Sequence, residues 1–588
     1  MTTSAGPADE AAPPGSRQSG ALPGALAGLL AAAAAIGVAQ FAAGLGVPQS
    51  SPVIAVGQAA IDLAPAGVKE FAISAFGADD KTVLVGGILV LLALYAAAAG
   101  VLAARRLAAG LAALAVFAGV GLAAALTRPT ATVGYVVPTL AGALAGAIAL
   151  TFLARATAAL GPTGSPPSPP APEAPHTPQA SDTPQASDTP QASDTPQAPE
   201  APDQFTPRPA VRSGPAYFAP APGAAAAERS RWPARRRFLA YGGVTAGIAA
   251  AGDLAGRNLI NEHNIASARD ALRFPRPAIP APPLPAGRNL GVPGLSPFVT
   301  PDRTFYRVDT TLVAPQLAPA DWRLRIHGLV GREVVLTFAD LLRRPLTEAW
   351  ITLTCVSNPV GGPYVGNARW LGADLAALIR LARPQAGADQ LLCTSVDGFT
   401  SGTPLTVVLD GRDALLAVAM NGSPLPVEHG FPARLVVPGL YGYVSATKWV
   451  TDIEVTTFAA ARAFWVQRGW AQQAPIKTES RIDVPAAGAS LRPGRTAVAG
   501  VAWAQHKGIA AVEVRVDGGP WQQARLAAVP GIDTWRQWRW EWDALPGPHG
   551  LEARATDATG YTQTAVQADT IPNGASGYPS AQVTVRNS

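Results

Sequence analysis

Cysteine and histidine are both scarce in this sequence. The 588 residues contain two cysteines, Cys355 and Cys393. Two cysteines cannot build a disulfide framework, and this pair does not have metal-finger spacing. The six histidines all lie beyond residue 155. Because a b-type haem in a membrane bundle takes two histidine ligands, their absence excludes such a haem from the N-terminal quarter of the chain.

Charged residues are missing from four long stretches near the N-terminus. About 20 helical residues cross a hydrocarbon core of roughly 30 Å, and a buried helix of a soluble protein rarely stays uncharged over that length. We therefore predict a cytoplasmic tail over residues 1–20 and a four-helix transmembrane domain over residues 21–155. The uncharged stretches lie within residues 18–61, 83–104, 107–127 and 129–154.

Basic residues at the ends of these stretches predict the topology. Arg17, Arg105 and Arg155 fall at alternate ends, which the positive-inside tendency assigns to the cytoplasm. Lys69, Lys81 and Arg128 lie on the other side and oppose this assignment. The predicted topology has both ends of the four-helix unit inside the cell.

Residues 156–234 contain a stretch rich in Pro, Ala, Ser and Thr, with TPQASD three times in succession over residues 177–194. Proline removes hydrogen-bond donors, and these side chains offer little apolar area, so the sequence predicts a disordered linker. The repeat is either a spacer, which we favour, or a binding site for a partner.

The C-terminal half reads as two globular regions after an extended, Pro-rich linker over residues 256–300. Strand-like WRLRIHGLV and helix-like GADLAALIRLA predict a mixed α and β domain over residues 301–481. Short alternating strands with DGG, PG and TG turns predict an all-β sandwich over residues 482–588. Basic residues are scattered without a basic stripe, which argues against nucleic acid as a partner.

Three tryptophans alternate along one predicted strand, Trp538, Trp540 and Trp542. Alternate residues share one face of a strand. An aromatic face of this kind either binds sugar or packs inside a sandwich, and we favour packing.

The segment ITLTCVSNPVGGPYVGNARWLGADLAALI places Cys355 at the end of a β-rich run, before a loop rich in Gly, Pro and Asn. A lone cysteine is most often a small buried apolar residue, which is our interpretation of Cys393. At a strand-to-loop junction, however, a thiolate can bind a soft metal. His429, Arg434 and Lys448 follow in turn-rich sequence, where they either converge on an anionic ligand or form ordinary salt bridges.

These stretches together resemble the sulfite oxidase family of molybdenum enzymes, from about residue 301 to the C-terminus. The resemblance rests on Cys355 followed three positions later by Asn358, and then on GNARWLGADL, MNGSPLP, HGFPARLVVPG and TKW in the same order. The C-terminal region resembles the immunoglobulin-like dimerisation domain of that family. The implied fold class is multi-domain: a helical membrane bundle, an α+β molybdopterin domain and an all-β immunoglobulin-like sandwich.

The resemblance implies that Cys355 is the protein ligand of molybdenum, which also binds the dithiolene sulfurs of one molybdopterin. It implies cofactor contacts for seven further positions, of which Asp397 and Arg307 are the weaker matches. A planar Arg and a Lys suit a phosphate, as the family pattern requires. The seven positions are Asn358, Asp397, His429, Arg434, Thr447, Lys448 and Arg307.

The sequence also departs from the family. Members that oxidise sulfite carry arginines directly after the Asn, where this chain has Pro359 and Val360. Arg369 either replaces that catalytic charge or forms a surface ion pair. A tyrosine near the metal is replaced by Trp470, which we expect to be a catalytic-site residue.

A protein that binds molybdopterin folds in the cytoplasm, so its export needs a route for folded cargo. The sequence RRRFLAYGGVTAGIAAAG over residues 235–252 resembles a twin-arginine signal, which supplies that route. We predict that residues 235–255 form a fifth transmembrane segment that remains as an anchor. Five ordinary membrane helices with stop-transfer arginines are the alternative.

The sequence thus predicts a bacterial membrane-anchored molybdenum oxidoreductase with an extracytoplasmic catalytic domain. The expected reaction is a two-electron oxygen-atom transfer on a small oxyanion or sulfur compound. The alternatives are a sulfoxide or oxyanion reductase, and a non-catalytic membrane-tethered binding or scaffold protein. Expected partners are a small-molecule substrate, a separate electron carrier that is a quinone or a cytochrome, and a second copy of the chain bound through the C-terminal domain.

Overall fold

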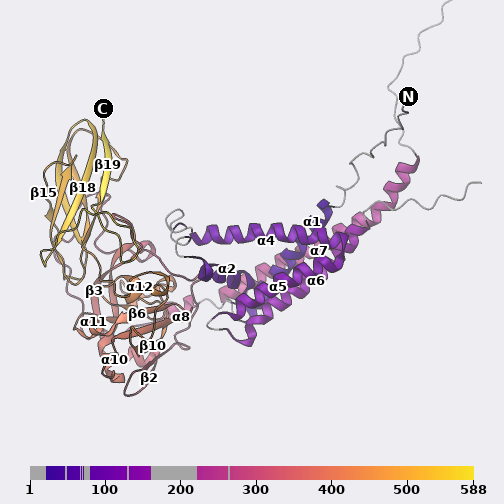
Figure 1. Ribbon diagram of the computed structural model, residues 1–588, viewed down its shortest axis with the longest axis horizontal. Coiled ribbons are helices and arrows are strands. Elements are labelled where there is room, and N and C mark those ends of the chain that lie inside the picture. Colours follow the sequence, from indigo (N-terminus) through magenta and orange to yellow (C-terminus); the bar gives the residue numbers. More distant parts are fainter. Residues whose placement is uncertain are drawn as a thin grey trace, which may run out of the picture.

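The computed structural model describes residues 21–46, 50–65, 68, 71, 80–128, 131–159, 222–262 and 265–587. An elongated helical region extends away from a β-rich part that carries the C-terminus (Figure 1). The predicted tail over residues 1–20 and the TPQASD repeats lie outside the described residues. The sequence-based division into a helical N-terminal region followed by a β-rich region is confirmed.

Five helices of the described chain are long and apolar enough to cross a membrane, within Ala21–Leu45, Lys81–Arg105, Leu107–Leu126, Val133–Ala158 and Arg235–Gly256. They arise because small apolar residues favour the helix and because charges lie only near the ends of the first four. The fifth also contains Arg236, Arg237 and Asp253. The helices of this region are α1 (Ala21–Leu45), α2 (Pro52–Leu63), α4 (Asp80–Arg105), α5 (Leu107–Leu126), η3 (Val133–Tyr135), α6 (Val136–Ala158) and α7 (Pro222–Glu262).

Small residues let these helices approach closely, as is usual where apolar helices pack together. A Cβ added to Gly28 of α1 would lie 1.9 Å from the carbonyl oxygen of Ala96 in α4, and one added to Gly100 would lie 2.2 Å from that of Gly24. On another side of α1, a Cβ added to Gly252 of α7 would lie 2.6 Å from the oxygen of Gly37. The segment that resembles a twin-arginine signal therefore packs along the first helix.

Two boundaries differ from the sequence-based expectation. The first uncharged stretch contains a second, shorter helix, α2, because Pro52 favours a new helix start after Ser51. Helix α7 begins at Pro222 and ends at Glu262, so it extends into both neighbouring segments that we expected to be linkers. Alanine-rich sequence ahead of residue 235 supports that extension, because alanine has the highest helix propensity.

The first β-rich region, after the short helix α8 (Ala266–Ala271), holds two sheets with helices between their strands. The strand-like segment WRLRIHGLV forms β1, and the helix-like segment GADLAALIRLA forms α10 (Leu375–Ala382). A further short helix, α9 (Phe338–Leu342), follows β2. One sheet has the order β2-β1-β10-β5-β6, with β1 parallel to β10, and the other has the order β3-β4-β7-β8, with β9 on β7. The strands are β1 (Arg323–Gly328), β2 (Val334–Thr337), β3 (Leu346–Thr354), β4 (Val365–Asp374), β5 (Gln390–Ser395), β6 (Thr400–Pro404), β7 (Leu415–Met420), β8 (Ser423–Pro424), β9 (Arg434–Val436) and β10 (Val450–Thr456).

Short helices and turns complete this region and carry several of its loops. They are η4 (Asp302–Thr304), α11 (Leu405–Leu409), η5 (Val427–His429), α12 (Gly442–Ser445) and η6 (Val466–Arg468). His429 belongs to η5, and Lys448 lies between α12 and β10. Both therefore lie outside the strands, whereas Arg434 is the first residue of β9.

The C-terminal region is a sandwich of two sheets, with orders β11-β13-β17-β16 and β12-β19-β18-β14-β15. Trp538 and Trp542 are buried in the core between them, which confirms the packing interpretation. The strands are β11 (Glu479–Val484), β12 (Ser490–Leu491), β13 (Gly494–Trp503), β14 (Ile509–Val516), β15 (Gln522–Gln523), β16 (Arg525–Leu526), β17 (Arg536–Ala544), β18 (Gly547–Asp557) and β19 (Ser580–Val585).

The helical region contacts the first β-rich region directly. Gln58 of α2 donates a hydrogen bond to the carbonyl oxygen of Thr310 at 2.8 Å and accepts one from the backbone of Leu312 at 2.8 Å. Arg468 donates to the carbonyl oxygen of Asp62 at 3.3 Å. These contacts come from the end of the helical region where α2 lies and α4 begins.

The α1–α4 contact gives a test of this packing. We expect Gly100→Leu to lower the free energy of unfolding by about 1–3 kcal/mol, because the new side chain meets the backbone of α1. Gly119→Leu is the matched control, since a Cβ at Gly119 meets no described atom within 4 Å. Thermal unfolding of the full chain in detergent measures both. Equal melting temperatures for the two variants would contradict the close α1–α4 contact.

Candidate active site

Cys355 directly follows strand β3 and begins the loop that leads to β4. Its backbone amide donates to the carbonyl oxygen of Tyr364 at 2.9 Å, which closes that loop. The side-chain oxygen of Asn358 accepts a hydrogen bond from the amide of Tyr364 at 2.8 Å and stabilises the same turn. The strand and the closed loop thus fix the position of the thiol at the wall of a buried cavity of about 100 Å³.

Burial raises the pKa of the Cys355 thiol, although hydrogen bonds from Ser357 and the charge of Lys448 act in the opposite direction. The thiol is therefore protonated at neutral pH in the absence of a metal. A metal that binds sulfur would displace this proton, so metal binding at Cys355 depends on pH.

Arg434 lies in the same cavity and is buried. Its guanidinium donates to the carbonyl oxygens of His429 and Ala446, both at 3.1 Å, and lies 5.2 Å from the centroid of the Trp370 ring. Burial lowers its pKa to about 10, so it still carries its charge at neutral pH. Among the described residues it has no carboxylate partner. The cavity therefore contains a buried positive charge that an anionic ligand can neutralise.

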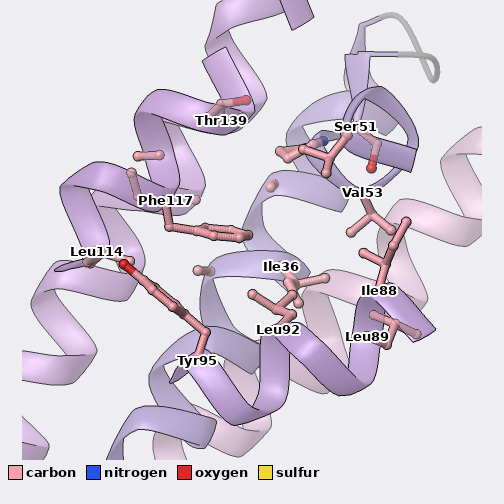
Figure 2. A pocket seen from close by; sticks show the side chains of 18 of the residues that line it. Ile36, Ser51, Val53, Ile88, Leu89, Leu92, Tyr95, Leu114, Phe117 and Thr139 are labelled. Atoms are coloured by element: carbon pink, nitrogen blue, oxygen red, sulfur yellow. The ribbon is translucent and has the colours of Figure 1, made fainter. Parts of the chain in front are cut away.

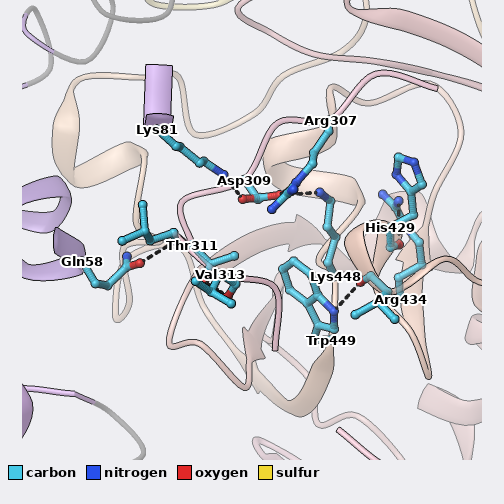
Figure 3. Close-up of polar contacts among 12 residues, drawn as sticks. Gln58, Lys81, Arg307, Asp309, Thr311, Val313, His429, Arg434, Lys448 and Trp449 are labelled. Atoms are coloured by element: carbon cyan, nitrogen blue, oxygen red, sulfur yellow. Dashed lines mark hydrogen bonds and ion pairs between the residues drawn. The ribbon is translucent and has the colours of Figure 1, made fainter. Parts of the chain in front are cut away.

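Asp309 gathers three cations at the edge of the cavity (Figure 3). Its carboxylate is 3.0 Å from Lys448 Nζ and 2.9 Å from Arg307 Nε, and it also pairs with Lys81, at the start of α4. Burial opposes the charge of Asp309, but Lys448, Lys81 and Arg307 together outweigh burial and lower its pKa. The helical region thus contributes a side chain to the network around the cavity.

Lys448 is the cation of this network that is most sensitive to pH. Burial lowers its pKa to about 8, although Asp309 acts to raise it. Lys448 therefore loses its charge as the pH rises through about 8, and an anion held beside it is held less tightly above that pH.

His429 is neutral at physiological pH, because burial and the charges of Lys448 and Arg434 lower its pKa to about 3. Its Nε2 lies 3.3 Å from the carbonyl oxygen of Asp302, which can only accept, so Nε2 carries the hydrogen. Nδ1 is then an acceptor, and it has no hydrogen-bond partner among the described residues. This nitrogen is available to a donor group of a ligand.

The other predicted cofactor residues have different surroundings. Thr447 is buried, and its hydroxyl lies 2.5 Å from that of Ser401. Asp397 lines the cavity, and burial raises the pKa of its carboxyl group. The amide nitrogen of Asn358 is buried without a partner in the described part of the chain. The structure thus places Cys355, Asp397, Arg434, Lys448 and Trp470 on the cavity wall. Its lining does not include His429, Thr447, Asn358 or Arg307.

Arg369 does not lie at the cavity, contrary to the prediction that it supplies the catalytic charge there. It belongs to β4, directly opposite Trp350 of β3. Its guanidinium is 3.2 Å from the carboxylate of Glu348 and 5.7 Å from the centroid of the Trp350 ring. This is the surface ion pair that we considered as the alternative, and the positive charge of the cavity comes from Arg434 and Lys448 instead.

Sequence reasoning missed three ionisable residues of the cavity wall, Tyr306, Asp309 and Tyr443. Burial and the nearby Cys355 raise the pKa of Tyr306, so its hydroxyl remains protonated and can donate. Tyr443 donates to the carbonyl oxygen of Ala471 at 2.5 Å. None of the three belongs to a recognisable motif, and only the proximity of Tyr306 and Asp309 to Arg307 in the sequence gave any signal.

The Asp309 network predicts how anion binding depends on pH. Asp309→Asn removes the carboxylate that raises the pKa of Lys448, so we expect that pKa to fall below about 8. Sulfate keeps its charge between pH 6 and pH 9 and is a suitable probe. Calorimetry should show that the affinity of the parent for sulfate falls above about pH 8, and that the fall in the variant begins at lower pH.

Asp452→Asn is the control, because Asp452 pairs with His327 away from the cavity. Superimposable pH profiles for the parent and Asp309→Asn would show that Asp309 does not set the charge of Lys448.

Comparison with known proteins agrees with this site. Residues 311–465 match the family described as oxidoreductase molybdopterin binding domain. Sulfite oxidase of Gallus gallus is 31% identical over 304 residues, which cover 43% of this chain and 65% of that protein. Mitochondrial sulfite oxidase of Homo sapiens is 28% identical over 47% of this chain and 58% of its own length. The chain thus spans about half to two thirds of these relatives.

Two further matches extend the comparison. An uncharacterized oxidoreductase of Bacillus subtilis (strain 168) is 34% identical over 149 residues, which are 25% of this chain and 72% of that protein. The solved structure of the sulfane dehydrogenase SoxCD from Paracoccus pantotrophus is 25% identical over 50% of this chain and 85% of its own, with a TM-score of 0.44. The chain belongs to the sulfite oxidase family of molybdopterin-dependent oxidoreductases.

Proposed function

We propose that this protein is a membrane-anchored molybdenum oxidoreductase that transfers an oxygen atom between water and a small sulfur compound or oxyanion. The observation that carries the proposal is the position of Cys355 at the end of β3, facing a cavity with Lys448 and with Arg434, which has no carboxylate partner in the described part of the chain. The sulfite oxidases among its relatives support a sulfur compound as the substrate.

The residues of the cavity fit a molybdenum–molybdopterin cofactor. A thiolate suits a soft, high-valent metal, and buried cations suit the phosphate of the pterin. Arg434 has no carboxylate among the described residues, and Nδ1 of His429 has no donor, so both are available to a ligand of this kind. When bound, the cofactor supplies the two-electron redox change, while Arg434 and Lys448 hold negative charge beside it.

Aromatic side chains form much of the cavity wall and favour a second candidate, the reduction of an organic sulfoxide. Phe399, Tyr443, Trp465 and Trp470 all line the cavity. Their rings offer apolar contact to the organic groups of a sulfoxide, which an inorganic oxyanion lacks. Assays of the metal-loaded protein with sulfite and with methyl sulfoxides separate the two reactions.

Metal content tests the proposed function. We expect the parent, produced in a molybdopterin-competent bacterium, to hold close to one molybdenum per chain, and Cys355→Ser to show altered metal coordination or reduced metal. Cys393→Ser is the matched control, because Cys393 is also buried but lies in β5, away from the cavity. Elemental analysis, pterin fluorescence and the molybdenum(V) resonance give the readout. A folded parent with neither metal nor pterin would favour the scaffold alternative.

We also propose that the helices anchor the chain in a bacterial cell membrane with the catalytic domain extracytoplasmic. Its support is that Gln58, Asp62 and Lys81, which the topology assigns to the outer side, all contact the β-rich part. The twin-arginine route is part of this proposal, because the catalytic domain must fold around its cofactor before it crosses.

Substitution of the arginines tests that route. We expect the double variant Arg236→Lys and Arg237→Lys to block export of the metal-loaded domain, because a twin-arginine route requires arginine itself. If positive charge alone were required, lysine would replace arginine and export would continue. Arg105→Lys with Arg106→Lys is the control, since it changes an arginine pair elsewhere in the helical region. Protease accessibility in intact spheroplasts measures export, and normal export of the first variant would favour five ordinary membrane helices.

For the C-terminal sandwich we propose an immunoglobulin-like fold that joins two chains. Its two sheets and their common core support the first part, and the resemblance to the family's dimerisation domain supports the second. Light scattering of the full chain in detergent determines whether it is a dimer.

A further inference from the structure

The helical region contains a cavity of about 370 Å³. Helices α1, α2, α4, α5 and α6 all contribute to its wall, and the lining is almost entirely apolar (Figure 2). Its size lies within the range of small-molecule binding sites, roughly 300–1,000 Å³. Nothing in the proposed chemistry at Cys355 uses this cavity.

The few polar groups of the wall lie at the end of the cavity that is nearer to the β-rich part. Thr139, in the first turn of α6, is 4% exposed, and its hydroxyl oxygen has no hydrogen-bond partner among the described residues. Ser51, just before α2, donates to the side-chain oxygen of Gln40 at 2.7 Å. A buried hydroxyl without a partner is unfavourable, so the Thr139 hydroxyl indicates a ligand with an acceptor oxygen.

Two aromatic rings flank the apolar part of the cavity, Tyr95 and Phe117 (Figure 2). Their centroids are 6.0 Å apart and their planes are inclined by 33°. The hydroxyl of Tyr95 donates to the carbonyl oxygen of Ala113 at 2.7 Å, so this ring presents its apolar body to the cavity. Flat rings beside a lone hydroxyl suit a planar ring with a carbonyl oxygen.

The apolar space continues deeper into the helical region. A second cavity of about 60 Å³ shares part of its wall with the first and extends to Gly28, Ala99 and Leu150. A ligand whose ring lies near Thr139 therefore has room for an apolar tail. The residues common to the two cavities are Ala35, Ile36, Leu92, Tyr95, Leu114 and Phe117.

Helix α2 lies between the large cavity and the site of Cys355. Ser51 to Val53 and Val56 line the large cavity, whereas Ile54 and Gln58 of the same segment line a small interface cavity together with Asp397. Asp397 also lines the cavity of Cys355. One helix, about 10 Å across, thus separates the apolar cavity from an interface cavity that shares a wall residue with the Cys355 cavity.

We propose that the 370 Å³ cavity binds a membrane quinone, which exchanges electrons with the site at Cys355. The inference rests on the proposed function and names its electron carrier. In the oxidative direction, the substrate takes an oxygen atom from water and releases two electrons and two protons. The quinone accepts both electrons and both protons and leaves as the quinol. A planar ring, an acceptor carbonyl and an apolar tail match the rings, the Thr139 hydroxyl and the adjoining apolar space.

Direct binding of quinone tests the proposal without any substrate. Decylubiquinone and menadione serve as probes for the metal-loaded full chain in lipid nanodiscs. We expect Ala118→Phe, which fills the cavity, to raise the dissociation constant at least tenfold. Gly119→Phe is the matched control, because a Cβ at this neighbouring position meets no described atom within 4 Å.

A second pair of variants tests the polar end and remains informative if Ala118→Phe does not fold. Thr139→Val removes one donor and should raise the dissociation constant about 3- to 10-fold, the effect of one hydrogen bond. Thr151→Val is its control, because the Thr151 hydroxyl donates to Ala147 of its own helix at 2.7 Å and does not line the cavity. Equal loss in a variant and its control, failure of both probes to bind, or a bound lipid that neither probe displaces would overturn the proposal.

Reoxidation of the chemically reduced metal centre tests the electron exchange. We expect one quinone to reoxidise one reduced site in the parent and in Gly119→Phe, but at least tenfold more slowly in Ala118→Phe. Ferricyanide should reoxidise all three proteins equally. A parent without molybdenum would refute the proposed function, whereas a molybdenum-loaded parent that ferricyanide but not quinone reoxidises would refute only the quinone site.

Discussion

The buried carboxylate of Asp309 is the interaction on which the arrangement of the site depends. It joins Lys448 of the cavity, the adjacent Arg307 and Lys81 of the helical region. A buried lysine without a partner would lose its proton readily, because burial penalises its charged form. Asp309 keeps Lys448 charged while leaving Arg434, which has no acid among the described residues, for a ligand. The network therefore holds a positive charge in the cavity and attaches that cavity to the helices.

The composition of the helices differs between their close contacts and their cavity. Glycine and alanine let α1, α4 and α7 approach until a Cβ would meet backbone atoms. Where α2, α4 and α5 line the cavity, most side chains are larger, among them Val53, Ile88 and Phe117. Larger residues at the α1–α4 contact would force these two helices apart. Small residues therefore set the close contact, and larger apolar side chains form most of the cavity wall that α2, α4 and α5 contribute.

Much of the fold could be predicted because its signals are local. A charge-free run of 20 residues indicates a membrane helix in any context, and alternation indicates a strand, so β17 with its three tryptophans was identified from sequence. The motif order around Cys355, Arg434 and Lys448 also identified three residues that line one cavity. Asp309 and Tyr306 could not be found in this way, because nothing in their own segment shows what lies opposite them. For the same reason the sequence left two alternatives open for Arg369, since its motif does not show that it pairs with Glu348.

Two of the three basic residues that oppose the predicted topology, Lys81 and Arg128, have a structural role that reconciles them with it. Positive charges on the outer side are unfavourable for orientation, yet Lys81 pairs with Asp309, and Arg128 lies 2.8 Å from the carboxylate of Asp62. Asp62 in turn accepts a hydrogen bond from Arg468 through its backbone. Both cations are therefore part of the contact between the helices and the β-rich region. These positive charges weaken the topological signal, but they contribute to the surface of the helical region that contacts the catalytic domain.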